Sequence, residues 1–160
     1  MAGEDLPDLN GKRIIVVEDD YLLATDICRE LRALGAVVLG PAPTPFYATQ
    51  LIGRRNIDAA VLDIYLHGTN VFSVADHLRA QGVPIIFATA FDRKEIPQRF
   101  QDACLLEKPL DRNKLISEIV AMTRNPPRSA NVEQLPIALL SPQAPAQVFG
   151  RALARTIATD

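Results

Sequence analysis

Acidic side chains stand directly after an apolar run near the start of the 160-residue sequence. In the stretch RIIVVEDD, apolar residues 14–17 lead into Glu18, Asp19 and Asp20. Carboxylates this close together repel one another unless a cation lies among them or they point into water. Mg²⁺ is such a cation, because it prefers oxygen ligands and is commonly held by one or two carboxylates and a phosphate oxygen. The stretch therefore suggests a metal site.

Three later apolar runs also end in residues that could take part in chemistry. DAAVLDI carries Asp63, PIIFAT ends in Thr89, and ACLLEKP carries Lys108. A carboxylate beside a metal can attack a phosphoryl donor and form an acyl phosphate. A lysine can pair with the phosphoryl group as a point charge, and a threonine hydroxyl can donate a hydrogen bond to it. We therefore predict that Asp63 accepts a phosphoryl group and that Thr89 and Lys108 assist it.

Five apolar runs have the length of strands and lack polar alternation, as expected of strands covered on both faces. They are residues 13–18, 36–40, 58–64, 84–89 and 103–107. Such strand–helix alternation predicts an α/β fold with a parallel sheet and helices on both faces. Ligands of such sheets bind at the carboxyl ends of the strands, where the four candidate stretches end.

Helical spacing of apolar residues fills the intervals between the runs. DYLLATDICRELRALG predicts a helix ended by Gly35, and TPFYATQLIGRRN predicts one with Thr44 as N-cap and Pro45 first. NVFSVADHLRAQG predicts a third helix. DRKEIPQRFQ predicts only a short or irregular helix because of Pro97. DRNKLISEIVAMTR predicts a last helix capped by Asp111.

The composition excludes several classes of protein. A net charge of −2, from 17 basic and 19 acidic residues, gives no electrostatic footprint for nucleic acid. Cys28 and Cys104 lie in apolar periodic segments and read as reduced core residues. The first residues do not resemble a signal peptide, and no apolar run approaches the roughly 20 residues that span a bilayer. We expect a cytoplasmic protein without membrane insertion.

The character of the sequence changes after Arg124. Residues 125–160 contain Pro126, Pro127, Pro136, Pro142 and Pro145. We expect this tail to be largely irregular, with a terminal stretch that can form an amphipathic helix through Val148, Phe149, Ala152, Leu153 and Ile157. The tail is too short and too proline-rich for a winged-helix output domain, so no DNA binding is expected. The predicted domains are residues 11–124 and this tail.

The ordered set IIVVED, VLDIYL, IIFATA and LLEKP resembles the receiver domain of two-component response regulators, over about residues 11–124. Glu18 lies 45 positions before Asp63, the spacing such domains show between their first acid and their phosphoacceptor. The resemblance implies a flavodoxin-like, doubly wound, five-stranded parallel sheet with strand order 2-1-3-4-5.

The resemblance also assigns roles to the candidate residues. Mg²⁺ would be held by Asp19, Asp63 and the backbone carbonyl of Tyr65, with Glu18 acting through water. Asp63 would be the phosphoacceptor. Thr89 would be the switch hydroxyl, and Lys108, followed by a proline that is usually cis, would bind the phosphoryl group.

The chain departs from the common receiver pattern in two places. Thr89 lies only 26 positions after Asp63, so the third helix or its loops are short. Leu105 stands where these domains usually carry an aromatic residue, three positions before the lysine. FATAF at residues 87–91 resembles the FATGUY response regulators, although Ala90 replaces the glycine of that motif and Asp92 its tyrosine.

Two further positions bear on the lifetime of an acyl phosphate. Tyr65 and Phe91 stand two residues after the phosphoacceptor and the switch threonine, and in the resemblance they flank the path of the attacking water. Two large rings there predict slow self-dephosphorylation. His67 lies near the site and is interpreted as a surface loop histidine rather than a phosphorelay or metal residue.

The leading hypothesis is a stand-alone receiver that is phosphorylated on Asp63 and signals by protein–protein interaction. Its expected partners are a sensor histidine kinase and an output or phosphotransfer protein, and a homodimer is compatible with the sequence. Its chemistry would be limited to self-phosphorylation and self-dephosphorylation, so it is not an enzyme in the usual sense.

A metal-dependent phosphohydrolase that forms an aspartyl phosphate is the alternative, but Tyr65 stands where such an enzyme needs its acid. A degenerate, purely structural receiver is a third reading, disfavoured by the complete residue set.

Overall fold

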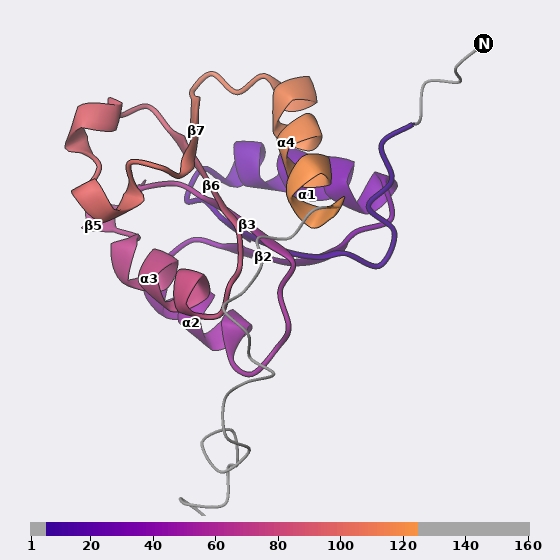
Figure 1. The fold of residues 1–160 in the computed structure, drawn as a ribbon, viewed down its shortest axis with the longest axis horizontal. Coiled ribbons are helices and arrows are strands. Elements are labelled where there is room, and N and C mark those ends of the chain that lie inside the picture. The colour runs from indigo at the N-terminus through magenta and orange to yellow at the C-terminus, as the bar shows by residue number, and fades with distance from the viewer. Residues whose placement is uncertain (1–5, 125–160) are drawn as a thin grey trace, which may run out of the picture. The chain divides into compact units, whose positions relative to one another are not determined.

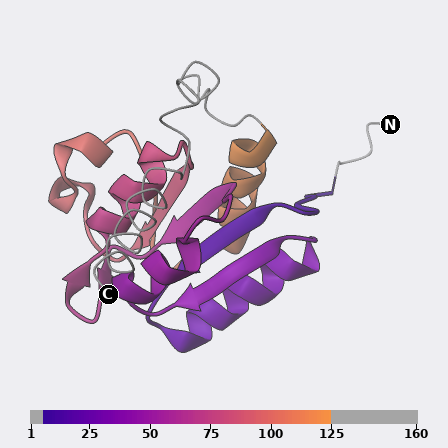
Figure 2. The same ribbon diagram turned by 90° about the horizontal axis from the view of Figure 1, so that it is seen from below.

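The computed structural model of the protein describes residues 6–124. A five-stranded sheet consists of β1 (Arg13–Val17), β2 (Val37–Ala42), β3 (Ala59–Leu62), β6 (Ile85–Thr89) and β7 (Cys104–Glu107). The strands lie in the order β2-β1-β3-β6-β7, and every neighbouring pair is parallel, as the arrows in Figure 2 show. The predicted α/β fold and strand order are therefore confirmed. The predicted tail, residues 125–160, lies outside the described residues.

Helices cover both faces of the sheet (Figure 1). α1 (Tyr21–Ala33) and α4 (Arg112–Arg124) lie on one face, and α2 (Pro45–Ile52) and α3 (Phe72–Ala80) lie on the other. Successive residues of a strand point to opposite faces. Ile14 therefore packs in the core beneath α1 and α4, and Ile15 packs in the core beneath α2 and α3. Because both faces are covered, the strands are apolar throughout, which is the pattern that predicted them.

The helix ends follow the predicted local signals. The carboxylate of Asp20 accepts a hydrogen bond from the Leu23 amide at 3.1 Å and caps α1. Thr44 caps α2 in the same way, ahead of Pro45 at the first helical position. Beyond the end of α1, Gly35 has a φ of +93°, and a Cβ there would lie 2.9 Å from a backbone atom of Asn10. Glycine is therefore required at that position.

The connection from β6 to β7 contains two short 3₁₀ turns, η1 (Arg93–Glu95) and η2 (Gln98–Phe100), in place of a regular helix. The expectation of a short or irregular helix is thus confirmed. Phe100 is fully buried, and its ring centroid lies 5.6 Å from the rings of both Phe72 and Phe87. The turns are therefore anchored in the core beneath α3.

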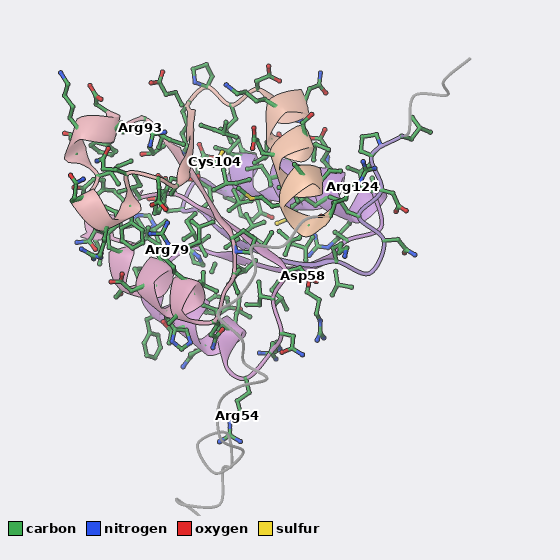
Figure 3. The ribbon with its side chains drawn as sticks, in the orientation of Figure 1. Arg54, Asp58, Arg79, Arg93, Cys104 and Arg124 are labelled. Carbon is green, nitrogen blue, oxygen red and sulfur yellow. The ribbon has the colours of Figure 1, made fainter. Side chains whose placement is uncertain are left out.

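Charged side chains hold this connection from outside. The guanidinium carbons of Arg79 and Arg99 lie 4.9 and 4.7 Å from the centre of the Phe100 ring. Arg99 donates two hydrogen bonds to Asp76, and Arg79 donates one to Asp102 at 3.1 Å. Figure 3 labels Arg79 beside the turns. We call these five residues the Phe100 cluster.

A short antiparallel hairpin, β4 (Tyr65–Leu66) and β5 (Thr69–Asn70), follows β3 and was not predicted. Its base is fixed in the core, because Leu66 and Val71 are buried and the Val71 amide donates to the Ile64 carbonyl at 2.8 Å. Strands of two residues are too short to show a periodicity in the sequence.

The two cysteines, Cys28 and Cys104, are free thiols. Cys28 is buried and Cys104 is half-buried, and burial raises the pKa of both thiols. Both therefore remain protonated and unreactive at neutral pH. Among residues 6–124, no helix is both long enough and apolar enough to cross a membrane.

Candidate functional site

The three acids that follow β1 have different surroundings. Glu18 is buried, 4 % exposed, and its amide donates to the Ala42 carbonyl on the neighbouring strand. The Asp19 carboxylate accepts a hydrogen bond from the His67 amide at 3.0 Å. Asp20 caps α1 and donates its own amide to Glu18 at 3.1 Å. The predicted role of Asp20 at the start of the helix is confirmed, which leaves Glu18 and Asp19 for the site.

Asp63 and Lys108 join Glu18 at the carboxyl ends of the strands. The Asp63 amide donates to the Val17 carbonyl at 2.8 Å, so β1 and β3 end side by side. Lys108 follows β7, and its Nζ lies 2.8 Å from Oε2 of Glu18 and 3.0 Å from Oδ2 of Asp63. The side chains of the two acids are only 3 % and 9 % exposed. One lysine thus bridges two buried carboxylates. We call Glu18, Asp19, Asp63 and Lys108 the Asp63 site.

The electrostatics of the Asp63 site reflect burial together with an excess of negative charge. Burial raises the pKa of Glu18 to about 7, and the charge of Asp63 adds to the rise, against the opposing hydrogen bonds from Lys108 and the Asp20 amide. Burial alone would lower the pKa of Lys108, but its bonds to Glu18 and Asp63 outweigh that effect and raise it. Three acids and one lysine leave unneutralised charge that a further cation would offset.

The donor set fits a hard divalent cation. One carboxylate oxygen each from Glu18, Asp19 and Asp63 lies within 4.8 Å of the others. Oxygen ligands of this kind, few in number and leaving room for water, are what Mg²⁺ takes in proteins. Tyr65, whose carbonyl is the fourth predicted ligand, begins β4 two residues after Asp63.

Thr89 lies beside Lys108 but points its hydroxyl elsewhere. It is the last residue of β6 and is fully buried. Its carbonyl accepts a hydrogen bond from the Lys108 amide at 2.9 Å, whereas its Oγ1 accepts one from the Phe91 amide at 3.2 Å. The Lys108–Pro109 peptide bond is cis. Leu105 packs, partly buried, against the core, so no aromatic ring occupies that position.

The rings of Tyr65 and Phe91 meet above this edge of the sheet. Their centroids lie 4.4 Å apart with the planes tilted by 54°. Tyr65 is half-buried, and Phe91 remains 39 % exposed. The two positions named from the sequence are therefore in direct contact and form one aromatic pair.

His67 is the residue that sequence reasoning undervalued. Its backbone amide reaches Asp19 across 48 positions of sequence, and its Nδ1 lies 3.7 Å from the same carboxylate oxygen. The imidazole itself is 67 % exposed, as expected of a loop histidine. The sequence offers one weak signal for this contact. His67 and Gly68 stand between two short stretches in which polar and apolar residues alternate, a pattern that can indicate the turn of a hairpin.

An apolar groove borders the Asp63 site on the side of α1 and α2. It is lined by Glu18, Asp19, Tyr21, Ala24, Pro41, Pro43 and Tyr47. Tyr21, which lines the groove, is 74 % exposed. Leu22 and Phe46, which adjoin the groove residues Tyr21 and Tyr47 in sequence, are 74 % and 72 % exposed. Large apolar side chains in such a group commonly mark a surface that contacts another protein.

Comparison with protein families gives one matching family for this arrangement. The family model described as the response regulator receiver domain matches residues 14–120. The phyllosphere-induced regulator PhyR of Methylorubrum extorquens is 30 % identical over 112 residues, which cover 68 % of this chain and 42 % of PhyR. The transcriptional regulatory protein PdtaR of Mycobacterium tuberculosis is 26 % identical, over 68 % of this chain and 55 % of PdtaR. This chain spans about half the length of these curated relatives.

Solved structures give the same fold. The solution structure of SdrG from Sphingomonas melonis Fr1 is 29 % identical and has a TM-score of 0.61, covering 72 % of this chain and 98 % of SdrG. A solution structure of the BeF₃-activated conformation of SdrG is 30 % identical and has a TM-score of 0.58, covering 69 % of this chain and 95 % of that one.

Proposed function

The chain belongs to the response regulator receiver domain family, and we propose that it accepts a phosphoryl group on Asp63 and passes the signal on by protein–protein contact. The observation that carries the proposal is the lysine of the Asp63 site. Lys108 lies 3.0 Å from Asp63 and bridges it to Glu18, so a cation already stands where a phosphoryl group on Asp63 would bring new negative charge.

The proposed donor is the phosphohistidine of a histidine kinase or a phosphotransfer protein. A carboxylate oxygen of Asp63 attacks the phosphorus atom and forms a P–O bond while the P–N bond breaks. The imidazole nitrogen leaves with the electron pair of that bond. The exposed Tyr21 and Tyr47, which line a groove together with Glu18 and Asp19, support docking of such a protein there, because its histidine must come close to Asp63.

Mg²⁺ is the proposed cofactor. Asp19, Asp63 and the carbonyl of Tyr65 would hold it, with Glu18 acting through water. When bound, the ion supplies positive charge that offsets the charge of the phosphoryl oxygens. The close approach of three carboxylates supports this assignment.

Lys108 and Thr89 are the proposed partners of the phosphoryl oxygens. Lys108 would exchange part of its contact with Glu18 and Asp63 for an ion pair with the new group. Thr89 would turn its hydroxyl from the Phe91 amide toward the same group. That exchange would free the Phe91 amide, and the change could spread to residues that follow β6. The output surface we propose is the one formed by β6, the two 3₁₀ turns and β7.

The phosphohydrolase alternative receives less support. It requires an acid two residues after the phosphoacceptor, and Tyr65 stands there with its ring against Phe91. Free thiols at Cys28 and Cys104 are typical of a reducing compartment, which supports a cytoplasmic location. Phosphorylation and its reversal are thus the only chemistry proposed for this chain.

The proposal is tested with a small phosphodonor such as acetyl phosphate and Mg²⁺. Wild-type protein should acquire one acid-labile phosphate, and Asp63→Asn should acquire none. Asp76→Asn is the matched control, since this exposed acid pairs with Arg99 outside the site, and it should behave as wild type. Acid-labile phosphate on Asp63→Asn would show that the acceptor is wrong.

A further inference from the structure

The β4–β5 hairpin brings a backbone amide to one acid of the Asp63 site. Two residues, His67 and Gly68, connect its strands, and Leu66 pairs with Thr69 across the turn. Their φ angles are +48° and +82°. Positive φ at both central residues defines a type I′ turn, the connection that matches the twist of a two-residue hairpin. The turn fixes the direction in which the His67 amide points.

That direction is toward Asp19. The His67 amide donates to Oδ2 of Asp19 at 3.0 Å. Within residues 6–124, His67 is the only non-glycine residue with a positive φ. Such a conformation is uncommon for a residue with a side chain. The local backbone is thus held in an unfavourable region while its amide contacts a carboxylate 48 positions earlier in the chain.

The base of the hairpin makes this contact rigid. Leu66 and Val71 are buried, and the Val71 amide is bonded to the Ile64 carbonyl. The imidazole, by contrast, is 67 % exposed and its Nδ1 is 3.7 Å from Asp19, beyond hydrogen-bonding distance. The amide, rather than the ring, makes the close contact.

The contact acts on an acid that belongs to the predicted metal site. The His67 amide holds Oδ2 of Asp19 at 3.0 Å. One carboxylate oxygen of Asp19 also lies within 4.8 Å of carboxylate oxygens of Glu18 and Asp63. The amide therefore restricts the orientation of a carboxylate that faces the other two acids.

We propose that His67 is a positioning residue, whose backbone amide, aimed by the type I′ turn, orients the Asp19 carboxylate for Mg²⁺. The inference rests on the proposed function of the Asp63 site. It goes beyond that function because it makes the turn, and not only the acids, a determinant of metal affinity. Groups that orient a ligand in this way commonly change metal affinity by about 10- to 100-fold when they are lost.

The first set of variants separates the amide from the ring. His67→Gly and His67→Asn keep the backbone amide, and both residues accept a positive φ. Because the orienting amide is retained, the Mg²⁺ affinity of both variants should stay within about twofold of wild type. His67→Val disfavours the turn, and His67→Pro also removes the N–H. Both should weaken Mg²⁺ binding about tenfold. Mg²⁺ titration of ¹⁵N-labelled full chain, followed by amide shifts, measures each dissociation constant.

A pair of glycine variants provides the matched control. Gly68 and Gly11 both have positive φ, +82° and +74°, and a Cβ at either would meet nothing within 4 Å. Gly68→Ala should weaken Mg²⁺ binding by a smaller factor than His67→Val, and Gly11→Ala should leave it unchanged. If Gly68→Ala and Gly11→Ala weakened Mg²⁺ binding equally, backbone strain in general, and not this turn, would be responsible for the loss of affinity.

A direct signature completes the test. In metal-free protein, Asp19→Asn should move the amide proton of residue 67 upfield, because a charged acceptor is lost. This measurement does not require any turn variant to fold. The inference is overturned if that proton does not move, if folded His67→Val binds Mg²⁺ like wild type, or if His67→Gly binds as weakly as His67→Val. Failure of wild type itself to bind Mg²⁺ would instead contradict the proposed function.

Discussion

Two groups of charged side chains on this fold differ in how their charges balance. The Asp63 site has three acids and one lysine, and the side chains of Glu18 and Asp63 are 3 % and 9 % exposed. The Phe100 cluster has two arginines and two aspartates, and the Arg99–Asp76 pair is about half exposed, at 54 % and 50 %. One group is buried with an excess of negative charge, whereas the other is balanced and open to water.

The difference indicates what each group does. In a balanced, exposed ion pair the two charges neutralise each other, so no further ion is needed. In the Phe100 cluster the ion pairs hold the two arginines against the buried ring of Phe100. Buried like charges oppose folding and are retained where their environment serves a reaction. In the Asp63 site, burial raises the pKa of Glu18 to about 7, and the charge of Asp63 adds to the rise. The excess of buried charge thus supports the proposal that the Asp63 site is the functional region, whereas the balanced charges of the Phe100 cluster support a structural role.

The largest effect on stability should come from the structural region. Phe100 is fully buried between Phe72 and Phe87. Phe100→Ala should lower the free energy of unfolding by about 3–5 kcal/mol, measured by urea denaturation. The exposed Phe46 serves as control, because Phe46→Ala should change stability by less than about 0.5 kcal/mol. Folded Phe100→Ala should still be phosphorylated. Loss of phosphorylation in folded protein would place Phe100 in the functional region.

The next effect is a pH dependence that belongs to the functional region. Glu18 has a pKa of about 7 when folded, above its ordinary value of 4.5. The folded state therefore binds the Glu18 proton more tightly than the unfolded state does. This contribution to the free energy of unfolding is complete below about pH 4.5 and is lost as the pH rises through 7. Glu18→Gln removes the titration. In EDTA, wild type should lose about 2 kcal/mol relative to Glu18→Gln between pH 5 and 8.

Urea denaturation of both proteins across that range measures the difference. Parallel pH profiles for wild type and Glu18→Gln would contradict the claim that burial holds Glu18 near neutrality. The balanced Phe100 cluster supplies the control, because Asp76→Asn should follow the wild-type profile in shape.

Removal of one cation from each region compares them directly. Lys108→Ala leaves Glu18 and Asp63 unpaired, and at pH 8 it should lower the free energy of unfolding by about 1–2 kcal/mol. This value lies between those of exposed and of fully buried pairs, because the Lys108 side chain is 20 % exposed. Protonation of Glu18 limits the loss, so the effect should shrink at pH 6. The fold should persist, but most of the phosphorylation-dependent response should disappear. Arg99→Ala, on the balanced side, should stay close to wild type in both respects. Equal effects of the two variants would remove the distinction between the regions.

A smaller effect concerns how long the phosphate lasts. The rings of Tyr65 and Phe91 contact each other beside the site, and neither offers a carboxylate or amide to orient water. Tyr65→Asn/Phe91→Glu should lose phosphate about tenfold faster than wild type, which corresponds to about 1.4 kcal/mol of barrier. Phosphate loss is followed at one fixed Mg²⁺ concentration. A double variant that loses phosphate no faster than wild type would show that shielding does not set the lifetime.

The smallest effect tests whether the two regions communicate. On phosphorylation, Thr89 should release the Phe91 amide, and hydrogen exchange should change mainly within residues 89–101. The change should be modest, because the Phe100 cluster anchors the end of this segment. Hydrogen-exchange mass spectrometry with and without phosphodonor locates it. Changes confined to α1 would mean that the signal leaves by another route.

Most of the fold could be predicted because each strong signal is local. Uninterrupted apolar runs mark strands covered on both faces, and Asp20, Thr44 and Asp111 cap the helices that follow them. The 3₁₀ turns were foreseen as irregular because Pro97 lies among them. The β4–β5 hairpin was missed because its strands are two residues long and its turn places a histidine, rather than asparagine or glycine, at positive φ.

The contacts of the site likewise divide into those that the sequence predicts and those that it does not. Strand ends of a parallel sheet lie at one edge, so the sequence could place Glu18, Asp63 and Lys108 together. In the structure, Nζ of Lys108 lies within 3.0 Å of an oxygen of each of the two acids. The contact of His67 with Asp19 and the contact of Tyr65 with Phe91 depend on how loops fold over that edge. Such contacts join residues far apart in sequence and leave no periodic signal.

The central claim is that the excess charge of the Asp63 site serves phosphoryl transfer to Asp63 itself. The most direct measurement is to phosphorylate wild-type protein with acetyl phosphate, reduce the acyl phosphate with borohydride to trap it as an alcohol, and locate the altered residue by peptide mass spectrometry. The account predicts alteration of Asp63 alone, and only when Mg²⁺ is present. Alteration at Glu18 or Asp19, or alteration of Asp63 that is unchanged in EDTA, would contradict it.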